Sequence, residues 1–263
     1  MNHKRSLGRA IFAALAVAAF VVPAASAAIP EVGRCVKVAN GAGAYRGAAC
    51  ITHETGRVGK YEWIPVTEAE KQKFTGAGSS IILLTAGHST LTCVNANISG
   101  EYTGPKTATV EIEFQACTNA ENKQCQTTPA QLTEIKSLPL EAELGFIKNQ
   151  PPAIKVGLDL KPKSPLTALA TYECGTATET ARIEGSVIAQ IKPINKMTTE
   201  SNLLYKTTRA GAQVPESFEG GPKDTLSTTF MSGLESTTAP SSMSMTGESG
   251  TNASALEIKA KEA

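Results

Sequence analysis

Side chains that could do chemistry are few and widely spaced in this chain of 263 residues. The pair His53-Glu54 begins like the H-E-x-x-H helix of zinc enzymes, but Arg57 stands where the second histidine is required. Asp159 and Asp224 are the only aspartates, so closely spaced aspartates cannot form a calcium loop. No glycine-rich phosphate loop joins a strand to a helix. The sequence therefore predicts no metal ion and no cofactor.

The other histidine after the N-terminal region, His88, ends a segment that looks like part of a protease site. Residues 83–88 (LLTAGH) resemble the strand-end histidine motif of chymotrypsin-like serine proteases, and residues 217–222 (SFEGGP) lie where the nucleophile motif would follow. Glu219 occupies the place of the nucleophile, and Ser89 replaces the cysteine that normally follows the histidine. A histidine base without a nucleophile cannot form an acyl intermediate. We therefore expect no catalytic residue in these motifs. We expect that neither His53 nor His88 acts as a base, and that His88 lies in a turn.

Glutamates are the remaining candidates for acid–base chemistry, and most of them occupy polar positions of alternating segments. A glycosidase needs two carboxyl groups flanking the scissile bond, and the sequence alone singles out no such pair. The segment Tyr61-Glu62-Trp63 suggests a different role, because flat aromatic rings stack on sugar faces. Tyr61 and Trp63 are therefore a candidate binding platform. The alternative is that Trp63, the single tryptophan, fills the core.

All six cysteines follow residue 27, and an even number in an exported chain is typical of disulfides. No C-x-x-C pair is present, which argues against a zinc site. Six cysteines allow about 15 pairings, and the sequence cannot choose among them. Short spacing suggests two local bonds and one long closure. The suggested pairs are Cys35–Cys50, Cys117–Cys125 and Cys93–Cys174.

Residues 1–27 have the three parts of a secretory signal peptide. Basic residues come first, an apolar run spans Ala10 to Val22, and Ala25-Ser26-Ala27 is a small-residue cleavage site. The run is shorter than the roughly 20 residues that a membrane-spanning helix needs. We therefore expect cleavage after residue 27 and a protein that is secreted or held at the cell envelope, without a transmembrane segment. The formal net charge of +1 provides no basic face for a nucleic acid.

The elements that must position these residues are mostly strands. Apolar and polar residues alternate in 107–114, 138–146, 154–160 and 181–191, and the same pattern is weaker in 80–85, 91–97, 166–174, 202–208, 225–231, 242–246 and 255–260. Such alternation is typical of half-buried strands. The one helical signal is a capping-box pattern in 67–74. Residues 28–263 are therefore expected to form one all-β domain, an antiparallel sandwich or a barrel-like fold.

One segment differs in composition. Residues 232–254 are rich in serine, threonine and glycine and poor in large apolar residues. Such a composition buries too little apolar surface to pack firmly. We expect this segment to be a mobile loop or a loose hairpin.

Cysteines, glycines and apolar motifs between about residues 75 and 230 form a recognisable set: Cys93, Gly100-Glu101, Gly104, Cys117, Cys125, Leu144-Gly145-Phe146, Val156-Gly157-Leu158, Cys174 and Gly185-Ser186-Val187. With this set the chain resembles a family of exported actinobacterial proteins of unknown function. The resemblance implies an exported β-rich protein and brings no active site with it. The favoured hypothesis is a non-enzymatic structural, adhesive or binding protein, with the cell envelope or an extracellular polymer as its partner. The alternative is a secreted hydrolase of such a polymer, with glutamates as acid and base.

Overall fold

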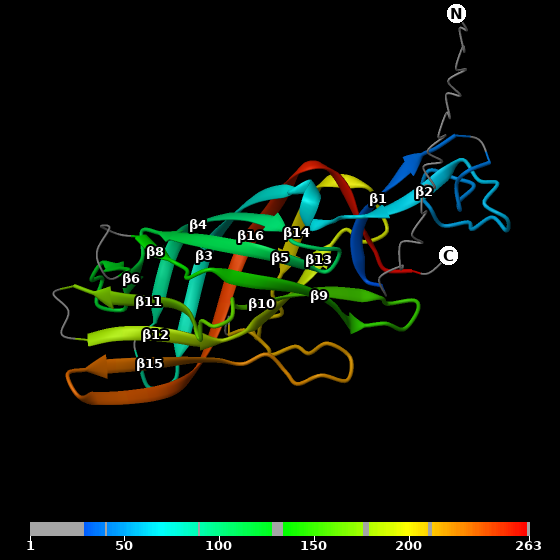
Figure 1. Cartoon of the computed structure of the whole chain (residues 1–263). Helices are drawn as coiled ribbons and strands as arrows, with labels where there is room; N and C mark the ends of the chain where they lie inside the picture. Colours follow the sequence, from blue (N-terminus) through cyan, green and yellow to red (C-terminus); the bar gives the residue numbers. More distant parts are fainter. Residues whose placement is uncertain are drawn as a thin grey trace, which may run out of the picture.

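The computed structural model describes residues 29–39, 41–88, 90–127, 134–175, 179–209 and 212–261; the expected signal peptide, residues 1–27, lies outside them. The described part is one antiparallel β-structure, as the sequence predicts (Figure 1). Its elements are β1 (Glu31–Lys37), β2 (Tyr61–Pro65), the 3-10 helix η1 (Glu68–Glu70), β3 (Lys73–Thr85), β4 (Leu91–Tyr102), β5 (Thr107–Gln115), β6 (Thr118–Asn119), β7 (Cys125–Gln126), β8 (Glu134–Lys136), β9 (Leu140–Lys148), β10 (Lys155–Pro162), β11 (Ala168–Cys174), β12 (Glu179–Gly185), β13 (Val187–Lys192), β14 (Thr198–Leu204), β15 (Leu226–Ser232) and β16 (Glu235–Lys259).

Eight of these strands close into a ring. Neighbouring strands pair in the order β14-β13-β10-β9-β5-β4-β3-β16, and β16 also pairs with β14. The closing contact sets Glu200 opposite Thr251 and Ser201 opposite Gly250. Period-two alternation turns one set of side chains inward, as in β5, where Ala108, Val110 and Ile112 are buried. The ring therefore has an apolar inner face and a polar outer face.

The other end of the molecule has two facing layers. From β16 the sheet continues through β15, β12, β11 and β7, and these strands share one core cluster with β3, β4 and β5. Ile81 of β3, Ile112 of β5, Tyr172 of β11 and Phe230 of β15 belong to this cluster. Figure 1 shows β11, β12 and β15 extending away from the end that carries β1 and β2. Strands β3, β4, β5 and β16 thus run through both parts.

The segment 232–254, expected to be a mobile loop or a loose hairpin, instead forms a tight hairpin turn and most of the central strand β16; of the weak strand candidates, 242–246 lies within β16 and 255–260 covers its end. β15 and β16 pair from Leu226↔Ser241 to Ser232↔Glu235, so the hairpin turns tightly at Gly233 and Leu234. β16 is 25 residues long in all, and beyond its pairing with β15 it pairs with β3, β14 and β1 in turn. Hydrogen bonds on both sides, rather than a continuous apolar face, hold this polar strand in place.

The segment 181–191, expected to be one strand, is two. β12 ends at Gly185 and β13 begins at Val187, and Gly185 has a φ of 111°. A Cβ at this position would collide with the carbonyl oxygen of Thr225. Only glycine accepts both the positive φ and the close approach, so the chain can leave one layer here and enter the other.

Three disulfides are present, but two of the pairs suggested from spacing are wrong. The structure bonds Cys35 to Cys50, the pair that spacing suggested. It joins Cys93 to Cys117 and Cys125 to Cys174, in place of Cys117–Cys125 and Cys93–Cys174. Strand pairing explains the difference, because Cys174 is the register partner of Cys125 in the β11–β7 pair.

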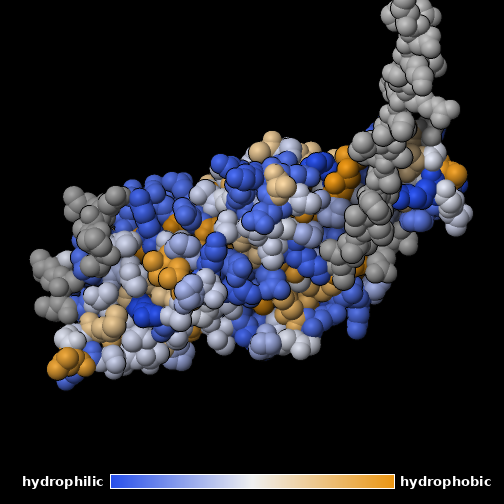
Figure 2. All heavy atoms as spheres, viewed as in Figure 1, coloured by the Kyte–Doolittle hydropathy of each residue, from blue (hydrophilic) through white to orange (hydrophobic). Residues whose placement is uncertain are grey.

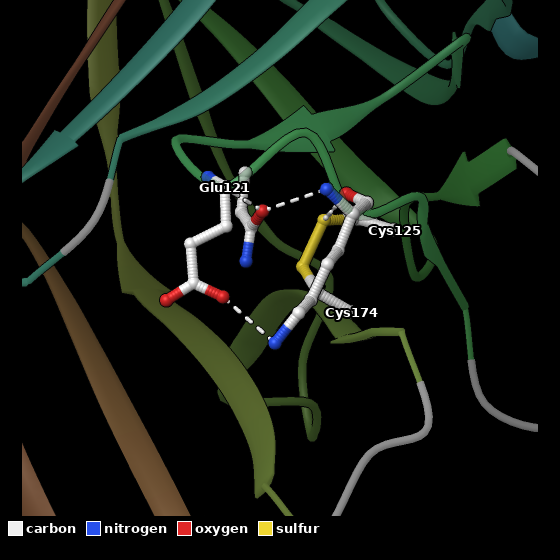
Figure 3. A network of polar contacts seen from close by, with 5 residues as sticks. Glu121, Cys125 and Cys174 are labelled. Atoms are coloured by element: carbon white, nitrogen blue, oxygen red, sulfur yellow. Dashed lines mark hydrogen bonds and ion pairs between the residues drawn. A yellow bond between two sulfur atoms is a disulfide. The ribbon is translucent and has the colours of Figure 1, made fainter.

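Figure 3 shows the Cys125–Cys174 bond beside the turn that carries Glu121. In this turn the Asn119 side-chain oxygen accepts hydrogen bonds from the backbone N–H groups of Glu121 (3.0 Å) and Lys123 (2.9 Å). Lys123 also pairs with Glu121 at 2.7 Å. The disulfide thus joins a turn with its own internal hydrogen bonds to the end of β11.

The described residues include no helix long and apolar enough to cross a membrane. The capping-box segment 67–74 forms only the three-residue η1 and then enters β3. Three disulfides in a chain of this kind fit an oxidising compartment outside the cytoplasm.

Candidate binding groove on the outer face

The outer face of β3, β4 and β5 carries a row of polar side chains. Pairing sets Thr75 opposite Ser99, and Ser99 opposite Glu111. The next row holds Asn97 opposite Glu113. Because side chains alternate across a strand, their neighbours Ile98 and Ile112 point to the other face. The same strands therefore supply both core residues and this polar surface.

Two adjoining hollows, of about 570 and 540 Å³, lie along these rows and share Ser99 and Glu111. Both volumes fall in the range of roughly 300–1,000 Å³ that is usual for ligand sites. Figure 2 shows that the visible face is mostly hydrophilic over the middle of the molecule. The charged or polar side chains that line the two hollows, here called the outer groove, are Lys73, Thr75, Asn97, Ser99, Glu101, Thr109, Glu111, Glu113, Lys136, Ser137 and Lys163.

Charges of both signs line the outer groove. Lys136 of β8 lies 3.7 Å from Glu113 of β5, and Gln115 donates a hydrogen bond to the same carboxylate at 3.0 Å. Glu101 and Lys73 are register partners at the opposite end. Ammonium groups donate hydrogen bonds, carboxylates accept them, and hydroxyl and amide groups do both. This mixture suits a ligand that presents many hydroxyl or amide groups without a large net charge.

The carboxyl groups with raised pKa values lie away from the outer groove. They are Glu31, Asp159, Asp224, Glu248 and Glu257, and in each case burial is the largest cause. None of these five side chains lines either hollow. A general acid needs a carboxyl group that keeps its proton near neutral pH. The carboxyl groups that burial perturbs are therefore found in other parts of the fold.

The aromatic pair proposed from the sequence does not form an open platform. Trp63 is only 7% exposed, and its indole N–H donates to Glu31 Oε1 at 2.6 Å. The Lys259 ammonium lies 4.9 Å from the centroid of the Trp63 ring. Tyr61 is half-buried on the same strand. Trp63 thus packs between β1 and the end of β16 and has no free face for a sugar. This agrees with the alternative reading of the sequence, in which Trp63 fills the core.

The histidines and Glu219 do not form a protease-like site. His88 lies in the β3–β4 turn and stacks on Phe230, with ring centroids 4.0 Å apart. Glu219 accepts a hydrogen bond from the backbone N–H of Asn149 at 2.6 Å. His53 contacts the Tyr45 ring edge-on at 5.4 Å. Each residue thus has its own local partner in a different part of the fold.

The structure brings together the only two aspartates, which sequence reasoning did not connect. The charge of Asp224 contributes to the raised pKa of Asp159, although burial is the larger cause. Asp224 accepts hydrogen bonds from the Ile188 N–H (2.7 Å), the Gln213 amide (2.8 Å) and the Glu216 N–H (2.6 Å). A carboxylate with three donors serves to fasten the 213–224 loop to β13. The sequence offered no signal beyond the rarity of aspartate.

Comparison with family models, curated proteins and solved structures gives no match for this chain. The similarity to exported actinobacterial proteins thus stays a prediction. Within the described residues, no group of three or more histidine, cysteine, aspartate or glutamate side chains could hold a metal ion. The case for function therefore depends on the surfaces and cavities of the fold.

Proposed function

We propose that this chain is an exported, non-enzymatic binding protein whose outer groove holds an extended segment of a polar extracellular polymer, such as a polysaccharide. The observation that carries the proposal is the continuity of the two hollows through Ser99 and Glu111. A groove that crosses three strands suits a chain-like ligand better than a compact one. The mixed donors and acceptors of its walls match a hydroxyl-rich ligand.

Export is part of the proposal and has separate support. The leader pattern of residues 1–27 predicts secretion, and the three disulfides fit an oxidising compartment. Polymers of the cell envelope and the extracellular matrix are present in that compartment, whereas cytoplasmic ligands are not.

A hydrolase that acts on the same polymer is the second candidate. Glu111 and Glu113 lie two residues apart on one face of β5, which places their backbones about 7 Å from each other. Inverting glycosidases separate their carboxyl groups by roughly 6.5–9.5 Å. The Glu113 carboxyl group is already engaged by Lys136 at 3.7 Å and by the Gln115 amide at 3.0 Å, which leaves it less free to act on a substrate. Binding without cleavage therefore has the better support.

Cosedimentation with insoluble cellulose, chitin and peptidoglycan tests the binding role. We expect the disulfide-bonded protein to sediment with at least one of these polymers. The variant Ser99→Tyr should lower that binding at least tenfold, since the ring fills the point that both hollows share. Tyrosine is well tolerated on a strand, so the fold should persist. Asn95→Tyr, an exposed position on β4 outside the groove, is the matched control.

Two outcomes would overturn the proposal. One is that the protein sediments with none of the three polymers. The other is that Ser99→Tyr binds as well as the wild type. Release of reducing ends by the wild type, abolished in Glu111→Gln, would establish the hydrolase instead.

A further inference from the structure

The ring of eight strands encloses an apolar cavity of about 60 Å³. Strands on opposite sides of the ring contribute to its wall, including β3, β5, β9, β10 and β14. The apolar residues of the wall are Val32, Phe74, Ile98, Ala108, Ala142, Leu144, Leu158, Ile191, Leu203 and Ile258. Apolar cavities with a few placed polar groups are the usual form of small-ligand sites.

Glu248 is the one charged side chain among the described residues that line this cavity. It is 6% exposed, and its Oε1 atom has no hydrogen-bond partner. A buried carboxyl oxygen without a donor destabilises the fold, because that atom has lost its water and gained no hydrogen bond in return. The other polar lining groups include Tyr102, whose hydroxyl already donates to Asn252 at 3.0 Å.

An irregularity in β16 turns Glu248 inward. The register between β16 and β3 shifts between Ser244 and Ser249, and Gly247 has a φ of 65°. Bulges of this kind re-aim a side chain from one face of a sheet to the other. Opposite the bulge, a Cβ at Gly78 would collide with Met245 and come within 3.6 Å of Glu248 Cγ. Gly78 thus leaves the space that Met245 and Glu248 occupy.

From this geometry we propose that the cavity binds a short-chain primary ammonium ion, of about the size of ethylammonium, whose cationic head pairs with Glu248. The ammonium group supplies the hydrogen-bond donor that Oε1 lacks, and the alkyl group lies against the aliphatic wall. Size limits the ligand, since the cavity is less than half of the roughly 150 Å³ that accommodates benzene. This site lies inside the ring and is distinct from the outer groove.

Affinity should be modest because the ligand is small. The best tiny ligands gain no more than about 1.5 kcal/mol per non-hydrogen atom, which for three such atoms corresponds to a Kd on the order of 1 mM. The neighbouring ionisable groups are the phenols of Tyr102 and Tyr205. Burial raises the pKa of Tyr102 to about 12. Burial also raises the pKa of Tyr205, and the negative charges of Glu248 and Asp224 raise it further. Both phenols are therefore neutral at pH 8, where Glu248 supplies the charge.

Titration of the full disulfide-bonded protein with ethylammonium chloride, followed by amide chemical shifts in NMR, tests the site. At pH 8 we expect saturable shifts with a Kd near 1 mM for residues of β16 and β3 around Glu248. Glu248→Gln should weaken binding at least tenfold, and ethanol and propionate should bind at least tenfold more weakly. Glu257→Gln, another buried acid on β16 but outside the cavity wall, is the matched control.

A second measurement keeps the test decisive if Glu248→Gln does not fold. The wild type should bind ethylammonium at least fivefold more weakly at pH 5 than at pH 8, because a protonated carboxyl group no longer pairs with a cation. The proposal is overturned by an absence of saturable shifts up to 50-fold above the expected Kd. It is also overturned if ethanol binds as well as ethylammonium, or if Glu248→Gln and wild type bind alike.

Discussion

Lys259, at the end of β16, contacts both β2 and the loop that joins β1 to β2. Its loss should destabilise the protein strongly. Its ammonium donates to the Tyr45 hydroxyl at 3.0 Å and lies 4.6 and 4.9 Å from the ring centroids of Tyr45 and Trp63. It is only 7% exposed, and its charge favours the ionised forms of Glu31 and Glu257. One buried cation thus offsets two buried carboxylates.

The substitution Lys259→Met keeps most of the apolar stem and removes the charge. Removing one partner of a buried pair typically costs about 3–5 kcal/mol, because the opposite charge stays buried without compensation. The two cation–π contacts add up to about 2 kcal/mol each when they are desolvated. Since these terms overlap, we expect a loss of about 3–5 kcal/mol in the free energy of unfolding at pH 8.

The stability cost of Lys259→Met should depend on pH through the two buried carboxyl groups. Without Lys259, the already raised pKa values of Glu31 and Glu257 should rise further. A carboxyl group with a raised folded-state pKa contributes its full stability below its unfolded value and loses it as pH rises through the folded value. The cost of Lys259→Met should therefore be smaller at pH 5 than at pH 8.

Equilibrium denaturation in guanidinium chloride with disulfides intact, followed by circular dichroism, measures these free energies. Lys192→Met, an exposed lysine on β13, is the matched control and should change stability by no more than about 0.5 kcal/mol. In a Glu31→Gln background the cost of Lys259→Met should fall by at least about 1 kcal/mol, since one stranded charge is gone. A cost below about 1 kcal/mol, or one that is equal at pH 5 and pH 8, would refute this account.

The Cys125–Cys174 bond, Glu248, His88 and the leader can each be tested by a single experiment. Replacing both Cys125 and Cys174 by alanine opens a 49-residue loop and should cost about 4 kcal/mol in chemical denaturation, because the unfolded chain regains the entropy that the bond removes. Burial raises the pKa of Glu248 to about 7, so ionisation of this group should cost about 3 kcal/mol of stability between pH 4.5 and pH 7.5, and the loss over this range should be smaller by about that amount in Glu248→Gln than in the wild type in paired denaturation curves. His88→Ala should cost at most about 2 kcal/mol by thermal melting and leave polymer binding unchanged. N-terminal sequencing of secreted material should begin near Ala28, and retention of Met1 would contradict export.

Strands with clear alternation were predictable, because burial on one face leaves a period of two in the sequence. The segments 107–114 and 154–160 correspond to β5 and β10 within one or two residues. Only two short parts of β16, 242–246 and 255–260, showed a weak form of this pattern, and the long strand as a whole was not predictable, because its stability comes largely from hydrogen bonds to strands on both edges. Backbone hydrogen bonds do not depend on side-chain type, so the Ser-, Thr- and Gly-rich composition of β16 did not indicate a central strand.

Disulfide partners were only partly predictable for a related reason. Spacing along the chain estimates loop entropy, and this favoured joining Cys117 to Cys125. Those residues do lie side by side, since the Cys125 N–H donates to the Cys117 carbonyl at 2.8 Å. Their side chains nevertheless bond elsewhere, to Cys93 and Cys174. Register, which no local pattern encodes, decided the pairing.

The two proposed sites depend on the same alternation, which makes them separable by experiment. Ser99 and Ile98 are consecutive on β4, yet Ser99 lies in the outer groove at the point that the two hollows share, while Ile98 also contributes to the cavity wall. A bulky residue at an outward position should block a polymer and leave the interior intact. A change at Glu248 should alter the interior and leave the groove intact. Such independence holds only while the register of β3, β4 and β5 is fixed, because a slip of one residue would exchange the two faces. The Cys93–Cys117 bond ties β4 to the end of β5 and opposes such a slip.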